Sequence, residues 1–561
     1  MSTRYGKEMK RVKKTIISNT ITFILITLFV SLFSKVFGNE NSIIGVCTVI
    51  IGLCIVEKDL TQNPLRRFFW ILVLNIILGI GSYVVMQNAF IGIIINFILI
   101  FGIVYNTVDI YKKPLYYPFI LSYLFMMLTS PATLQGLPKR LISLSVGSMF
   151  VILLQLLFNR KKFEKTLTEK RKLIIEGLVS QIESSVNGKY DEHKEKQLRQ
   201  DINTLIKCIY DKREKNKILS DNSKINLNII LSLEKLAILV EVIVKHKKID
   251  KYKSFLSATK ESLERLNKSL NGKEIVKYET LDVEYYENDD ISKQLIQIFK
   301  SIKINVEDLS CSKEKINKDS DLLIKNIIKK VNIHSFSFKF SLKLSITLSI
   351  GIFLTTIFKL PYGKWLAFTI LALIHPYYEK CTKKVKERIV GTTIGVIVFA
   401  MLFTIVKDNT ARIIIVLLTS YINMYVKRYD YQMIFITIQG IGGAVTAGAH
   451  MGVALDRLVF VMLGVIISII VNRFIFKYEV EDSMEELYNI YEQCAFKISN
   501  MIEQENKGYN DVYNLLLEMK LIENVLIENS IEKNLDLYKK ISNIRNRILF
   551  SIDNCFKSIK V

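Results

Sequence analysis

The sequence has few cysteines, histidines and prolines: its 561 residues include seven cysteines, five histidines and seven prolines. The cysteines are scattered, and none forms a Cys-x-x-Cys or a histidine-spaced pair, so we expect neither a disulfide framework nor a zinc site. Cys47 and Cys54 fall in an apolar stretch, where they are expected to be buried as small hydrophobic side chains. We therefore predict no metal and no cofactor.

A phosphate-binding loop is also missing. No Gly-x-x-x-x-Gly-Lys-[Ser/Thr] motif occurs, so ATP hydrolysis by this chain is not expected. No set of residues in the sequence indicates catalysis either, and we predict that the protein is not an enzyme. If it pumps a solute, the energy would come from an ion gradient.

What the chain has instead is hydrophobic sequence and positive charge, kept apart. Half of the residues are hydrophobic, yet 77 are Lys or Arg. The separation predicts an all-α polytopic membrane protein, with two repeats of about six transmembrane helices plus helical cytoplasmic domains. The predicted parts are a basic tail (1–14), a first transmembrane block (15–158), a helical domain (159–337), a second transmembrane block (338–478) and a C-terminal helical domain (479–561).

Each apolar block divides into about six candidate spans. In the first block they lie near 15–36, 43–56, 68–87, 89–106, 115–131 and 140–158. In the second they lie near 340–358, 364–378, 388–406, 411–426, 430–449 and 454–476. The second span of each block is short, a feature that points to a binding site in transporters built from repeats.

Basic clusters predict the orientation in the cytoplasmic membrane. They lie at Arg4–Lys14, Arg160–Lys162 and Lys380–Arg388, on one side of an even number of spans. Positive charge next to apolar spans marks the cytoplasmic side, so both termini are expected in the cytoplasm.

The two polar blocks have helical periodicity, and 160–337 contains no proline. Their lysine excess is compatible with nucleic acid or anionic lipid, but Glu and Asp are interleaved, which favours a solvated helix surface near the membrane. We predict no nucleic-acid partner. The amphipathic tail is expected to pack on the cytoplasmic domain or on a second subunit, so a homo-oligomer is possible.

The strongest internal match joins the two sixth spans. Arg140-Leu-Ile-Ser-Leu-Ser-Val-Gly147 aligns with Arg457-Leu-Val-Phe-Val-Met-Leu-Gly464. An arginine within a span needs a partner or a wet cavity, so Arg140 and Arg457 are candidate ligands for an organic anion. Alternatively, Asp456 neutralises Arg457. Gly147 and Gly464 are expected to serve helix packing.

A second motif opens the third span of the second block: Arg388-x-x-Gly391-Thr392-x-x-Gly395. Glycines in membrane helices allow two backbones to approach, so Gly391, Thr392 and Gly395 are predicted to form a helix-packing face. Arg388 is either a cytoplasmic anchor or a third substrate-binding residue. In the first block, Phe69 and Val73 stand where this motif has its glycines.

Four titratable residues near the short spans are candidates for proton coupling. They are Glu57, Asp59, His375 and Glu379. Ordinary interfacial charge is the other interpretation of the same residues.

With Trp365-Leu-Ala, the Arg388-x-x-Gly-Thr motif and the duplicated block, the chain resembles the fusaric acid resistance protein-like family. That superfamily includes aromatic acid exporters and, more distantly, the aluminium-activated malate transporters of plants. The resemblance implies a secondary exporter of organic, often aromatic, acids, with a small organic anion and membrane lipid as its partners. The alternatives are an anion-conducting channel and a membrane scaffold with a partner-binding cytoplasmic domain.

Overall fold

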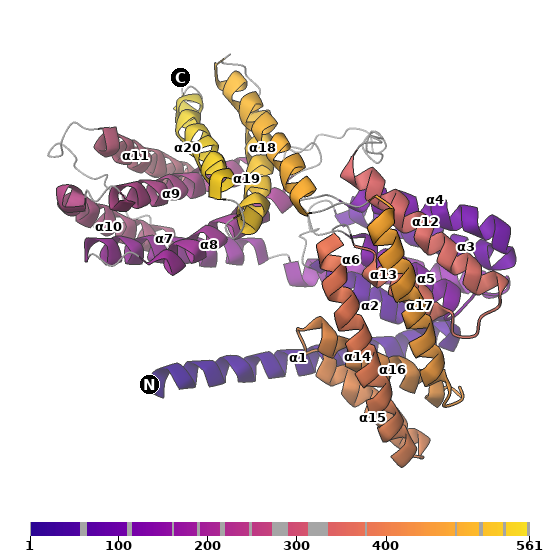
Figure 1. Ribbon diagram of the computed structural model, residues 1–561. Helices are drawn as coiled ribbons and strands as arrows, with labels where there is room; N and C mark the ends of the chain where they lie inside the picture. Colours follow the sequence, from indigo (N-terminus) through magenta and orange to yellow (C-terminus); the bar gives the residue numbers. More distant parts are fainter. Residues whose placement is uncertain are drawn as a thin grey trace. The chain divides into compact units, whose positions relative to one another are not determined.

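The computed structural model describes residues 2–56, 64–108, 115–159, 162–187, 191–213, 219–245, 249–271, 290–311, 335–375, 378–476, 480–503, 509–530 and 535–557. Every regular element within these ranges is a helix, so the predicted all-α class is confirmed for them. Two compact units are formed: one by α12 to α17 with α1 to most of α6, and one by α7 to α11 with α18 to α20 (Figure 1).

The first unit contains two groups of helices in the apolar parts of the chain. The earlier group comprises α1 (Ser2–Phe37), the short η1 (Asn39–Asn41), α2 (Ser42–Val56), α3 (Pro64–Gln87), α4 (Ala89–Thr107), α5 (Tyr116–Leu128) and α6 (Leu137–Asn159). The later group comprises α12 (Phe336–Ile357), α13 (Lys364–Leu373), α14 (Tyr378–Ile405), α15 (Asn409–Asn423), α16 (Tyr429–Thr446) and α17 (Val453–Phe474).

Eight helices of the described chain are long and apolar enough to cross a membrane, which confirms a multi-pass membrane protein. They are α1, α2 together with η1, α3, α4, α6, α12, α14 and α17. By contrast, α13 has ten residues and rises only about 15 Å, half of a typical hydrocarbon core. The repeat relating the two groups of helices remains a prediction.

Local sequence signals account for where several of these helices begin. The side chain of Asn88 accepts hydrogen bonds from the first backbone N–H groups of α4. Ser335 and Asp408 cap α12 and α15 in the same way. These short polar side chains satisfy donors that a helix cannot satisfy itself. Pro64 is the first residue of α3, where its fixed φ suits a helix and its missing N–H is not needed.

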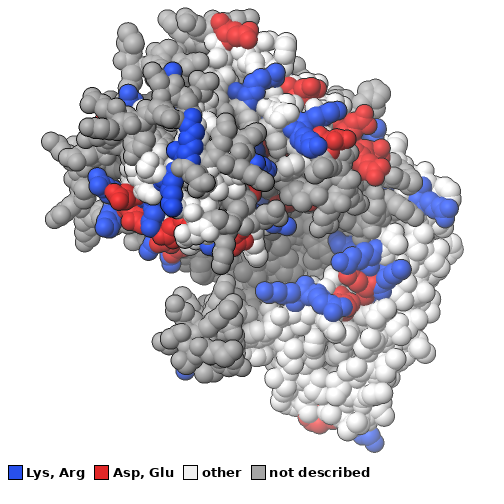
Figure 2. Space-filling view, turned by 60° about the vertical axis from the view of Figure 1, so that its left-hand side comes forward, with Lys and Arg blue, Asp and Glu red and all other residues white. Residues whose placement is uncertain are grey.

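The two groups of helices meet along α4 and α12. Phe90 of α4 lies 5.5 Å from Phe353 of α12, and Phe101 lies 5.4 Å from Phe338, as distances between ring centroids. These aromatic pairs bury large apolar areas between segments about 250 residues apart in sequence. Figure 2 shows a broad part of the surface without Lys, Arg, Asp or Glu, as expected for helices that face lipid.

The second unit is a helical domain of polar surface and apolar core. Its helices are α7 (Lys162–Val186), α8 (Glu192–Asp211), α9 (Asp221–Lys245), α10 (Ile249–Asn271), α11 (Asp290–Cys311), α18 (Val480–Glu503), α19 (Tyr509–Ser530) and α20 (Leu535–Lys557). The C-terminal helices pack on α8 and α9 of the same chain, so one of the two expected partners of the tail is found. Packing against a second subunit is not tested.

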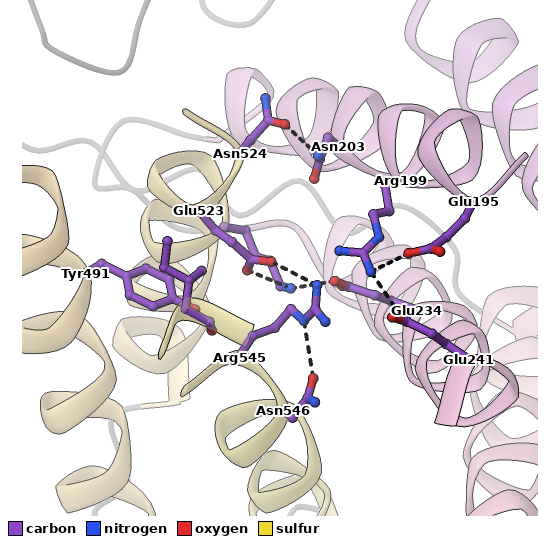
Figure 3. Close-up of polar contacts among 12 residues, drawn as sticks. Glu195, Arg199, Asn203, Glu234, Glu241, Tyr491, Glu523, Asn524, Arg545 and Asn546 are labelled. Carbon is purple, nitrogen blue, oxygen red and sulfur yellow. Dashed lines mark hydrogen bonds and ion pairs between the residues drawn. The ribbon is translucent and has the colours of Figure 1, made fainter. Parts of the chain in front are cut away.

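Polar contacts hold this packing together (Figure 3). Lys520 of α19 is 1% exposed at its side chain and lies 2.6 Å from Glu234 of α9 and 3.0 Å from Glu523. The amide of Asn203 in α8 donates to that of Asn524 at 2.6 Å. Each of these buried charges has an opposite charge beside it, so loss of one partner would leave an uncompensated charge in the domain.

Candidate functional site

The candidate site is a pair of buried arginines in the later helices, with one tryptophan. Arg457, in the second turn of α17, is 1% exposed, and Arg388 in α14 is 6% exposed. The guanidinium carbon of Arg457 lies 3.9 Å from the ring centroid of Trp365 in α13. We call Arg388, Arg457 and Trp365 the arginine site.

Few atoms of the described residues accept hydrogen bonds from these side chains. Arg457 donates to the carbonyl of Ile436 at 3.5 Å, a long contact. Its Nε and Nη1 have no acceptor among the described residues, nor does the indole Nε1 of Trp365. All of these buried atoms are donors. Leaving each one unsatisfied costs about 1–3 kcal/mol.

Arg388 has more partners, but they are neutral. It donates to the hydroxyl of Tyr429 at 3.3 Å, to Sδ of Met433 at 2.8 Å and to the hydroxyl of Thr369 at 3.4 Å. Its Nε has no acceptor among the described residues. Arg388 and Arg457 also lie within electrostatic range of each other. Two buried like charges without a carboxylate favour an anion between or beside them.

The expectation that Asp456 neutralises Arg457 is wrong for this structure. Asp456 instead lies beside His450, with 3.9 Å between Oδ2 and Nε2. The two residues are neighbours in sequence, but successive residues of a helix point about 100° apart. No ion pair of Arg457 is found among the described residues, and its side chain points into the packed interior, against Trp365.

Arg140 has a different environment from Arg457, although both were predicted to bind substrate. It is 1% exposed and donates to the carbonyl oxygens of Ser130 at 2.6 Å and Glu40 at 3.2 Å. Its Nε donates to the side-chain oxygen of Asn41 at 3.2 Å. These acceptors lie in η1 and just beyond the end of α5. Arg140 therefore joins two chain segments and has little donor capacity left for a ligand.

A glycine makes room for the arginine site. A Cβ atom at Gly440 of α16 would collide with Nη1 of Arg457 and would lie 2.8 Å from the indole ring of Trp365. In the sequence, Gly440 is one of several small residues at the end of the fifth span of the second block, a pattern typical of helix packing. Its position beneath Arg457 and the role of Trp365 were missed, since both follow from how α13, α16 and α17 assemble.

The glycines of the predicted packing motif lie at close helix contacts. A Cβ at Gly391 would collide with the backbone carbonyl of Asp430 in α16, and one at Gly395 would lie 2.7 Å from Cβ of Thr437. Thr392 between them is 2% exposed. In the sixth helices, a Cβ at Gly147 would lie 2.5 Å from Oγ1 of Thr48 and one at Gly464 would lie 2.8 Å from Cβ of Thr369.

The proton-coupling candidates are not brought into the arginine site by any described contact. Glu57 and Asp59 lie outside the described residues, and so does the side chain of Glu379. His375 is partly exposed, two residues beyond the end of α13. Their coupling role stays a prediction. Among the described residues, no group of His, Cys, Asp and Glu has a geometry that could hold a metal ion.

Comparison with known families places the arginine site in a recognised segment. The model of the fusaric acid resistance protein-like family matches residues 349–471, which run from α12 into α17. No curated protein and no solved structure matches the chain. The matched segment contains Trp365, Arg388 and Arg457, and the predicted resemblance is confirmed there. Residues 349–471 of this multi-pass membrane protein are therefore similar to the fusaric acid resistance protein-like family.

Proposed function

We propose that the protein is a membrane transporter that exports organic anions, with aromatic acids as its substrate class. The observation that carries the proposal is the arginine site, where buried donors of Arg457, Arg388 and Trp365 lack acceptors among the described residues. A carboxylate supplies two acceptor oxygens and a negative charge, and arginine binds it through two parallel hydrogen bonds.

The surroundings of the site suit an aromatic substrate. Phe368 lies 6.2 Å from Trp365 and 4.8 Å from Phe125 of α5, as distances between ring centroids. Aromatic rings stack favourably at such distances, so an acid whose carboxylate meets Arg457 could pack its ring on this cluster. The match to a fusaric acid resistance protein-like family supports transport as the activity.

The proposal includes a location in the cytoplasmic membrane, with both termini in the cytoplasm and coupling to an ion gradient. A carrier and an anion channel would use the same arginines, so flux has to separate them. Flux of benzoate that collapses with the proton gradient supports the exporter, whereas single-channel currents support the channel. A protein that moves no organic acid in liposomes would support the scaffold.

The test of the site uses purified full-length protein in liposomes and radiolabelled benzoate. Arg457→Gln removes the planar guanidinium and its charge. Benzoate flux should therefore fall by at least about tenfold, which corresponds to the loss of one charged hydrogen bond. Arg457→Lys keeps the charge but lacks the planar guanidinium, so it should retain only part of the wild-type benzoate flux. Arg473→Gln, an exposed arginine of the same helix, is the matched control. Wild-type flux in the double variant Arg388→Gln and Arg457→Gln would exclude the site.

A further inference from the structure

The later helices bury a third basic side chain, which the arginine site does not use. Of the described residues 335–476, the basic side chains less than a tenth exposed are Lys343 (2%), Arg388 (6%) and Arg457 (1%). No hydrogen bond or ion pair of the Lys343 side chain is found among the described residues. Its electrostatic neighbour is the thiol of Cys381. Like Arg388 and Arg457, it is a buried cation without a carboxylate partner in the described chain.

Contacts of α14 and α17 place Lys343 at one end of a row of three buried cations, followed by Arg388 and Arg457. Asn472, near the end of α17, donates to Sγ of Cys381 at 2.9 Å, and Cys381 lies beside Lys343. Arg388 lies at the level of Gly464, because it donates to Thr369, and Thr369 packs against that glycine. At 1.5 Å per residue, Gly464 is about 10 Å along α17 from Arg457, and Asn472 is about 12 Å further.

Polar atoms without partners accompany the three cations. Oδ1 of Asn472 and Oγ of Ser468 are buried and have no hydrogen-bond partner among the described residues. Ser468 lies one turn before Asn472 and one turn after Gly464 in α17, between the levels of Lys343 and Arg388. Buried polar groups in a membrane protein are costly and are found where they line a route for polar solutes.

We propose that Lys343 is a second anion-binding position on the same transport path, so that an anion passes Lys343, Arg388 and Arg457 along the later helices. The proposal rests on the proposed function for its substrate. The path itself can be tested without any substrate.

The first test measures whether water and anions reach the proposed path. In a variant with all native cysteines replaced, Ser468→Cys and Lys343→Cys are exposed to the anionic reagent 2-sulfonatoethyl methanethiosulfonate. Ile469→Cys is the matched control, because Ile469 follows Ser468 in α17 and is 42% exposed on the apolar surface. Both path thiols should react about tenfold or more faster than the control, since buried cations concentrate anions.

Equal, slow reaction of all three thiols would overturn the path, whatever the protein does with benzoate. Size-exclusion profiles of each variant show that it is folded. Should Lys343→Cys fail to fold, Ser468→Cys still decides the question, because its substitution removes no charge.

The second test separates binding at the arginine site from passage along the path. The sequence has two tryptophans, Trp70 and Trp365, so in a Trp70→Phe protein the fluorescence excited at 295 nm comes from Trp365. Lys343→Met should lower benzoate flux about tenfold while the benzoate Kd reported by Trp365 stays unchanged. Lys343→Arg should keep most of the flux. Lys339→Met, one turn away and partly exposed, is the control and should behave as wild type.

The outcomes distinguish this inference from the proposed function. Wild-type flux in Lys343→Met, or equal loss in Lys339→Met, overturns the role of Lys343. If the wild-type protein neither binds nor moves benzoate while the path thiols react, the aromatic-acid function fails and the path stands.

Discussion

Two arginines at the same position of matching sequence segments can have opposite roles. Arg140 is surrounded by carbonyl and amide oxygens from η1 and from the end of α5. Arg457 meets the face of Trp365 and one distant carbonyl. A guanidinium whose donors are all used stabilises the fold, whereas one with free donors can bind a solute. The difference between the two arginines therefore lies in the segments around them rather than in the matching sequence of α6 and α17.

Thermal unfolding should separate these roles. Arg140→Gln would leave the carbonyls of Ser130 and Glu40 without their donor, so we expect a loss of about 1.5–3 kcal/mol and a lower melting temperature. Arg457→Gln removes a buried charge that has no counter-ion in the described part of the chain, so its melting temperature should be unchanged or higher. Both variants are compared with wild type in one detergent. If Arg140→Gln kept its stability but lost benzoate flux, the substrate-binding prediction for Arg140 would stand.

At the scale of single residues, the sequence indicates which charged side chains are buried but not which atoms they contact. Arginines in apolar helices are visible in the sequence, and Arg388, Arg140 and Arg457 are all buried as such residues must be. Which acceptor each one meets depends on segments up to 100 residues away. The pairing of Asp456 failed for the same reason, because adjacency along a helix is not contact.

The contact between α14 and α16 depends on glycine at the scale of whole helices. At Gly391 and Gly395, the backbone of α16 comes so near that a Cβ would meet carbonyl oxygens of Asp430 and Ile434. Backbone atoms cannot move aside as a flexible side chain can. Helices in lipid associate through such close packing, because burying apolar surface from water contributes nothing there.

Gly391→Ala should therefore destabilise the protein by about 1–3 kcal/mol, the usual effect of overpacking. Gly443→Ala in α16 is a matched control, since its Cβ would meet nothing within 4 Å, and alanine also favours helix. The melting temperature of the detergent-solubilised protein should fall for Gly391→Ala and stay or rise for Gly443→Ala. Equal stability of the two variants, with flux lost only in Gly391→Ala, would indicate that Gly391 lines the transport path.

In the helical domain, α8 and α9 are joined by a charge cluster that should respond to pH. Arg199 lies 2.5 Å from Glu195 and 3.0 Å from Glu241 (Figure 3). Burial by itself would raise the pKa of Glu241, but the hydrogen bond from Lys245 and the charge of Arg199 outweigh it and lower the pKa. A lowered carboxyl pKa means that the folded domain favours the ionised form.

The sign of the pH effect follows from that direction. Glu241 contributes stability above the ordinary glutamate pKa of about 4.3, and the contribution disappears as pH falls through its lowered folded value. Glu241→Gln should thus melt at a lower temperature than wild type at pH 7, and this gap between the two melting temperatures should close as the pH is lowered. Glu264→Gln, half exposed at its side chain, should show no gap. Circular dichroism at 222 nm follows both variants, and a gap that widened at low pH would contradict the assignment.

At the scale of the whole molecule, the alternation of apolar and polar sequence predicts where apolar and polar helices occur along the chain. Helix existence was predictable because long apolar runs and caps such as Asn88 are local signals. The contact between α4 and α12 was not predictable, because nothing in the sequence around Phe90 or Phe353 indicates that these two residues pack together. Nor does periodicity reveal that the tail packs on α8 through Asn203 and Asn524.

The distribution of charge along the chain predicts the topology of the whole molecule. The basic residues Arg4–Lys14, Arg160–Lys162 and Lys380–Arg388 should all face the cytoplasm, because cytoplasmic connections retain Lys and Arg. The connection between α14 and α15 then faces outward. In cells expressing a cysteine-free protein, an impermeant maleimide should label Lys407→Cys directly and Asn187→Cys only after permeabilisation. Lys407 is exposed, so a lack of labelling there would not come from burial. Labelling of Asn187→Cys in intact cells would place the helical domain outside and would reverse the direction proposed for the path from Lys343 to Arg457.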